Sequence, residues 1–108
     1  MTHDSLAHLS GKPIAHVDNE LRDLIPDFLE NRWQDTLTIM EGLELGDYQT
    51  IRNLGHDLKG VGGAYGFDAI GDIGQSLEQA AMDENQAEIR KQVQELTTYL
   101  EQVEIVYE

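Results

Sequence analysis

Four tracts of this chain carry apolar residues at the spacing of an α-helix, at every third or fourth position. Such spacing gives each helix one apolar face, which has to pack against another element. The breaks between the tracts are short, and the strict alternation that is typical of strands is scarce. Short loops make successive helices antiparallel neighbours. The sequence therefore predicts an all-α protein, an up-down-up-down antiparallel four-helix bundle with an irregular N-terminal arm.

Capping residues mark the first two tracts. Asp18 is a suitable N-cap for the first, and Pro26 within it either kinks the helix or begins a new one with Asp23 as N-cap. We expect Gly46 to end this tract and Asp47 to cap the second. The apolar stripe of the first tract comprises Leu21, Leu24, Ile25, Phe28, Trp33, Leu37, Met40 and Leu43.

The remaining tracts follow the same logic. Gly66 is expected to end the second helix, Asp68 to cap the third, and residues 82–86 to form a polar connection to the fourth. The fourth stripe continues to Tyr107, so a helix is predicted to run that far. The three stripes comprise Ile51, Leu54, Leu58, Val61 and Tyr65; Ile70, Ile73, Leu77 and Ala81; and Ile89, Val93, Leu96, Leu100, Val103 and Tyr107.

The length of 108 residues suits one domain, which we divide into an arm over residues 1–17 and a bundle over residues 18–108. Gly11 and Pro13 interrupt any regular pattern in the arm. The chain has no cysteine, no apolar run long enough to span a bilayer, and no signal-peptide pattern over residues 1–10. We therefore expect a cytoplasmic protein, and the initial methionine and short length favour a freestanding chain.

The formal net charge is −14. Nucleic acids and anionic membranes attract clustered Lys and Arg, so this surface argues against both as partners. A protein partner with a basic or mixed surface is compatible with it. Acidic helices are also simply soluble, so the charge alone does not indicate a function.

The second tract contains five glycines between residues 55 and 66, an unusual number for a helix. Three or four interior glycines cost roughly 3 kcal/mol relative to alanine. On a helical wheel, His56 lies roughly 170° from the centre of the apolar stripe and so points to solvent. Gly60 and Gly63 lie on the same face as His56, at i+4 and i+7. We expect them to leave an open approach along which a second protein can reach the imidazole.

Two basic residues flank His56 on its half of the helix, Arg52 at i−4 and Lys59 at i+3. A neighbouring cation disfavours the imidazolium and so keeps a nucleophilic nitrogen available near neutral pH. The same cations can bind the oxygens of a transferring phosphoryl group. An exposed histidine with these neighbours is therefore compatible with phosphoryl chemistry.

The run around His56 closely resembles the signature of the histidine-containing phosphotransfer (HPt) domain family, in which a lysine follows the histidine by three residues and glycines follow by four and by ten. The departure from the family pattern is Val61, where small or polar residues are more usual, and we expect it to affect packing or partner fit. The similar segments are His56-Asp57-Leu58-Lys59-Gly60-Val61-Gly62-Gly63-Ala64-Tyr65-Gly66-Phe67, Leu24-Ile25-Pro26-Asp27-Phe28-Leu29, Leu45-Gly46-Asp47 and Leu77-Glu78-Gln79-Ala80-Ala81.

The resemblance implies a carrier in which His56 takes a phosphoryl group from a receiver-domain aspartate and passes it to another. Lys59 matches the phosphate-neighbouring lysine, and Gly60 and Gly63 match positions that clear the approach. The implied partners are receiver domains of response regulators and of a hybrid histidine kinase, with the chain itself a monomer. Neither a metal nor a cofactor is expected in the chain. The carrier acts stoichiometrically, so it is not an enzyme that turns over a small substrate.

Glu78 on the third helix is a candidate for orienting the imidazole. If the second and third helices are antiparallel about a turn near Phe67, residue 78 returns to the level of His56. Glu78 then reaches the Nδ1–H group and holds the tautomer that leaves Nε2 free. An ordinary surface glutamate is the alternative.

Other interpretations are weaker. The glycine run is not a nucleotide-binding fingerprint, because it follows no strand and Lys59 precedes it. His3, His8 and His16 have no organised surroundings in the sequence and are read as ordinary residues. The alternative function is a helical bundle that docks receiver domains without being phosphorylated.

Overall fold

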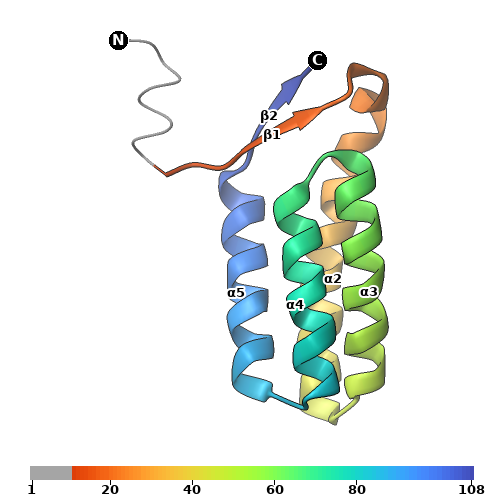
Figure 1. Cartoon of the computed structure of the whole chain (residues 1–108), viewed down its shortest axis with the longest axis vertical. Coiled ribbons are helices and arrows are strands. Elements are labelled where there is room, and N and C mark those ends of the chain that lie inside the picture. Colours follow the sequence, from red (N-terminus) through yellow and green to blue (C-terminus); the bar gives the residue numbers. More distant parts are fainter. Residues whose placement is uncertain (1–10) are drawn as a thin grey trace.

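A computed structural model describes residues 11–108, and most of them lie in four long helices (Figure 1). Expectations for residues 1–10, including His3 and His8, fall outside the described residues. The helices are α2 (Ile25–Leu45), α3 (Tyr48–Tyr65), α4 (Asp68–Met82) and α5 (Gln86–Gln102), preceded by a 3-10 helix, η1 (Asn19–Leu24). They run antiparallel to their neighbours in the chain (Figure 1). The predicted four-helix bundle is confirmed.

The predicted helix ends around α3 are also found. Gly46 and Gly66 both adopt a left-handed backbone, with φ of 69° and 88°, and so end α2 and α3. The Asp47 carboxylate accepts hydrogen bonds from the Thr50 backbone N–H at 3.1 Å and from its hydroxyl at 2.6 Å. These bonds hold the start of α3 and lower the pKa of Asp47 below its ordinary value.

The start of the first helical tract is divided between Leu24 and Ile25, directly before Pro26. Asp18 caps η1 by accepting from the Glu20 backbone N–H at 2.9 Å. A separate helix, α2, then begins with Pro26 in its first turn, and its N-cap is Leu24, where Asp23 was expected. Proline is suited to this position because its missing N–H would be unpaired there in any case. Similarly, Asp68 is the first residue of α4, and its N-cap is Phe67.

The two ends of the described chain form a small sheet, which the sequence did not indicate. Strand β1 (Ile14–Val17) pairs in parallel with β2 (Glu104–Tyr107), with Ile14 opposite Glu104 (Figure 1). The prediction that the arm is irregular up to residue 17 is therefore wrong for its last four residues. The prediction that the last helix reaches Tyr107 is also wrong, because α5 ends at Gln102.

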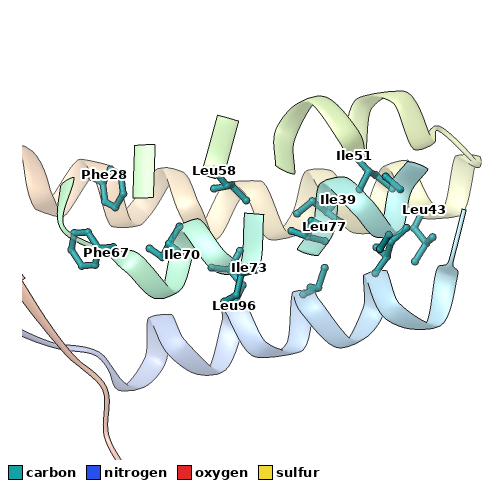
Figure 2. Close-up of a cluster of buried hydrophobic side chains, with 14 of the residues drawn as sticks. Phe28, Ile39, Leu43, Ile51, Leu58, Phe67, Ile70, Ile73, Leu77 and Leu96 are labelled. Carbon is teal, nitrogen blue, oxygen red and sulfur yellow. The ribbon is translucent and has the colours of Figure 1, made fainter. Parts of the chain in front are cut away.

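The core runs along the bundle axis between the helices (Figure 2). Phe28 stacks on Tyr65 and on Phe67, with ring centroids 4.6 and 5.1 Å apart, at the end near the sheet. The predicted stripes of α3, α4 and α5 supply nine of the 17 buried apolar residues, and their other six members are partly buried against the core. In the first tract the stripe was partly wrong, because Leu24 and Leu37 are exposed and Thr36 and Ile39 are buried instead.

Candidate functional site

His56 lies on the outer face of α3, about midway along the helix, and 69% of its side chain is exposed. The buried residues of α3, which include Ile51 and Leu58, are on the opposite side. The orientation expected from the helical wheel is therefore found. A ring in this position is open to another protein.

Glu78 of α4 lies beside the imidazole. Its Oε2 atom is 3.2 Å from Nδ1 of His56, and the glutamate side chain is only 23% exposed. A carboxylate can only accept a hydrogen bond, so this contact requires a proton on Nδ1. The neutral ring then carries its free lone pair on Nε2, the nitrogen that does not contact Glu78.

Glycines with two different surroundings lie near His56. A Cβ atom added at Gly60 or Gly63 would meet no atom within 4 Å, so the space expected along the helix is open. A Cβ atom at Gly55 would lie 2.7 Å from the Glu78 backbone nitrogen and 2.8 Å from the Gly74 carbonyl oxygen. The missing side chain at Gly55 thus allows α4 to approach α3 closely at the level of His56.

The predicted cations differ in their surroundings. Arg52 lines a polar hollow of about 440 Å³ together with His56, Asp57 and Glu78. Lys59 is exposed, and within residues 11–108 it forms neither an ion pair nor a side-chain hydrogen bond. Its ammonium group is therefore available to a partner.

A second hollow, on the α2 side of His56, includes two residues that the sequence analysis did not select. Arg32 and Asp35 on α2 form an ion pair in which Nε donates to Oδ2 at 2.7 Å, and both side chains are more than four-fifths buried. Burial raises the pKa of Asp35, and the Arg32 guanidinium partly opposes that shift. The i, i+3 spacing was visible in the sequence, but their position beside His56 depends on how α2 packs against α3.

His16 is less isolated than expected. Its Nδ1 atom lies 2.6 Å from Oε1 of Glu108, across the small sheet, and both side chains are more than half exposed. In the part of the chain from residue 11 onward, no group of three or more acidic or histidine side chains is arranged to hold a metal ion. In the same part, no helix has the length and apolar character needed to cross a membrane.

Comparison with known families agrees with this geometry. The family model described as the Hpt domain matches residues 15–105, which cover most of the chain. The chain therefore belongs to the Hpt domain family, and the resemblance found in the sequence is confirmed. It is a phosphotransfer module of two-component signalling, and the family to which it belongs consists of phosphocarriers rather than true enzymes. No curated protein and no solved structure matched the chain.

Proposed function

We propose that this chain carries a phosphoryl group on Nε2 of His56 and exchanges it with the aspartates of receiver domains. The observation that carries this proposal is the contact between Nδ1 of His56 and Glu78 on an otherwise exposed ring. It favours the tautomer whose lone pair is on the outward nitrogen. An outward, unprotonated nitrogen is what a nucleophile needs to reach a phosphorus atom on another protein.

The transfer step uses groups of this chain in defined roles. The Nε2 lone pair attacks the phosphorus of a receiver aspartyl phosphate, the N–P bond forms, and the P–O bond to the aspartate breaks, so the carboxylate leaves. The ring becomes cationic while its Nδ1 proton stays in place, and the Glu78 carboxylate stabilises that charge. The reverse step returns the phosphoryl group to another aspartate.

The cations and the open glycines complete the proposed site. Lys59 and Arg52 stabilise the negative oxygens of the transferring group, because they lie three and four residues from His56 and so on the same half of the helix. Gly60 and Gly63 leave room for the partner's reacting loop. The chain then acts as a monomer in the cytoplasm, with receiver domains of response regulators and of a hybrid kinase as partners.

A bundle that only docks receivers is the other candidate. The contact between Glu78 and His56 favours the carrier, because docking alone does not require an oriented imidazole. The two are separated by incubating the chain with a panel of purified, phosphorylated receiver domains. A carrier gains an acid-labile, base-stable phosphoryl group from at least one of them, whereas binding without any labelling would support the docking module.

A further inference from the structure

The hollow on the α2 side of His56 has a composition that the proposed chemistry does not use. It has a volume of about 630 Å³ and lies between α2 and α3, so a partner that reaches His56 also covers it. Its lining combines apolar side chains with charged ones. The residues that matter here are Arg32, Asp35, Leu54, Asp57, Val61 and Ala64.

Arg32 already has an ion-pair partner in this hollow. Its Nε donates to Asp35, and its guanidinium carbon lies 4.7 Å from the centroid of the Phe28 ring. Phe28 is itself held by stacking on Tyr65. Arg32 is thus a fixed part of the wall, and its charge is balanced by the Asp35 carboxylate.

The carboxylates outnumber the cation in this hollow. Arg32 contributes one positive charge, whereas Asp35 and Asp57 contribute two negative charges, which leaves one negative charge uncompensated. Burial is the main cause that raises the pKa of Asp35, and the repulsion from the charge of Asp57 makes a smaller contribution in the same direction. The Arg32 contact uses Oδ2 of Asp35, and within residues 11–108 Oδ1 has no hydrogen-bond partner. A cation placed between the two carboxylates would relieve this repulsion.

We propose that this hollow receives a lysine or arginine side chain from the receiver domain that exchanges the phosphoryl group with His56. The inference rests on the proposed function, since it places the contact beside the reacting imidazole. The long basic side chain lays its alkyl stem on Leu54 and Val61 and brings its charge to Asp35 and Asp57. The pairing selects among receivers, because a partner with an acidic residue at this point meets two carboxylates.

Both parts of the hollow fit this occupant better than the alternatives. A purely apolar side chain would cover the apolar lining but leave the carboxylates of Asp35 and Asp57 with less water around them, which is costly. An acidic side chain would add a third negative charge. A basic side chain has an apolar stem and a charged tip, and it matches both the apolar and the acidic residues of the lining. The net charge of −14 also favours a partner that is basic where it touches this chain.

The test uses the full chain and the receiver domain that exchanges phosphoryl groups with it fastest in the panel. Two variants, Asp57→Asn and Asp35→Asn, each remove one carboxylate of the hollow. Asp57→Asn is the safer of the two for folding, because Asp57 is exposed, whereas Asp35 holds Arg32. We expect each to raise the receiver concentration at half-maximal transfer by roughly three- to tenfold, with little change in the rate at saturation.

The matched control is Asp72→Asn on α4, which makes the same change of charge on an exposed residue that does not line this hollow. It should leave the half-saturating concentration unchanged. In addition, Asp57→Lys should weaken binding further, and replacing one particular Lys or Arg of the receiver by Glu should restore it. Such a rescue identifies the side chain that enters the hollow.

Each other outcome contradicts part of the account. If Asp57→Asn and Asp72→Asn raise the half-saturating receiver concentration equally, only the overall charge of the chain affects receiver binding. A lower rate at saturation with unchanged half-saturation would assign the carboxylates to the chemistry and not to docking. Weaker binding in Val61→Thr but not in Asp57→Asn would indicate an apolar occupant. If no receiver labels His56, the proposed function fails and this contact with it, whereas normal labelling without sensitivity to Asp57 overturns the contact alone.

Discussion

Helix α3 carries glycines on two faces, and their surroundings are opposite. On the face toward α4, a Cβ atom at Gly55 would lie 2.8 Å from the Gly74 carbonyl oxygen, and one at Gly62 would collide with the backbone of Gly71. On the face that carries His56, the glycines at 60 and 63 adjoin open space. The same residue type thus allows two helices to touch on one face and, we propose, a partner to approach on the other.

The glycines on the two faces have the same effect on helix propensity but differ in whether packing compensates for it. All of these glycines lose the helix propensity of a side chain, about 0.8–1 kcal/mol each relative to alanine. On the α4 side that loss is offset by close packing, so the chain itself benefits. On the outer face the described structure offers no contact in return. Glycines that lower stability and allow no packing contact are expected where function requires open space.

The largest effect is expected from filling the α4 side. Gly62→Ala should lower the free energy of unfolding by about 2 kcal/mol or more, because the new methyl group meets backbone atoms of Gly71 that can move only with the helix. The melting temperature, measured by circular dichroism, should fall by roughly 10 °C. Gly71→Ala is the matched control, since its Cβ would lie 3.4 Å from the nearest atom, the Lys59 carbonyl oxygen. Equal stability of the two variants would contradict a close contact at Gly62.

The next effect is on transfer and not on folding. Gly63→Leu should fold with unchanged or higher stability, because no atom lies within 4 Å of the new Cβ. It should slow phosphotransfer from a receiver by at least about thirtyfold, roughly 2 kcal/mol in the barrier, by blocking the approach to His56. Rates and melts measured on the same preparations check this. A steep loss of stability without a separate loss of transfer would mean that the outer face is also a packing face.

A smaller effect on transfer is expected from Lys59. Lys59→Ala should reduce the transfer rate at saturation by about tenfold, if its charge stabilises the phosphoryl oxygens in the transition state. Receiver binding should change less than the rate. Titrating the receiver separates the two quantities. Weaker binding with an unchanged rate at saturation would make Lys59 a docking residue instead.

The smallest effect is the gain in stability expected when alanine replaces a glycine on the outer face of α3. Gly60→Ala and Gly63→Ala should each raise the free energy of unfolding by up to about 1 kcal/mol, through restored helix propensity. Urea unfolding curves measure this directly. A destabilised variant at either position would remove the contrast between the two faces of α3.

The sequence predicted the elements whose signals are local. Gly46 and Gly66 each follow a helical stripe, so their left-handed turns could be anticipated. The exposure of His56 followed from a stripe on the same helix. The contact with Glu78 required only that two adjacent helices be antiparallel about a short turn. Each of these inferences involves residues on one helix or on two neighbouring ones.

Features that depend on distant parts of the chain were missed. Strands β1 and β2 are four residues each and pair across most of the chain, so neither has a pattern of its own to recognise. The stripe through Val103 and Tyr107 satisfied helical spacing by chance and led to a helix that was too long. The Arg32–Asp35 pair was not selected because its place beside His56 is set by the contact between α2 and α3.

The sequence also did not distinguish the glycines of α3 that face α4 from those on its outer face. Gly55 and Gly62 are seven residues apart and share a face, but the partners that make them necessary, Gly74 and Gly71, are on another helix. A glycine in a helix indicates that a side chain at that position would be unfavourable. It does not indicate whether the neighbour is a second helix or a second protein.

The central claim, that His56 carries the phosphoryl group, is tested most directly by mapping the label. The chain is phosphorylated by an active receiver and its phosphorylated residue is identified by mass spectrometry at neutral or basic pH, beside His56→Gln. The account predicts one phosphoryl group on His56 and no label in the variant, whose helical circular dichroism and melting temperature stay nearly unchanged because the side chain is exposed. A label that persists in folded His56→Gln, or that is found on His3, His8 or His16, would contradict it.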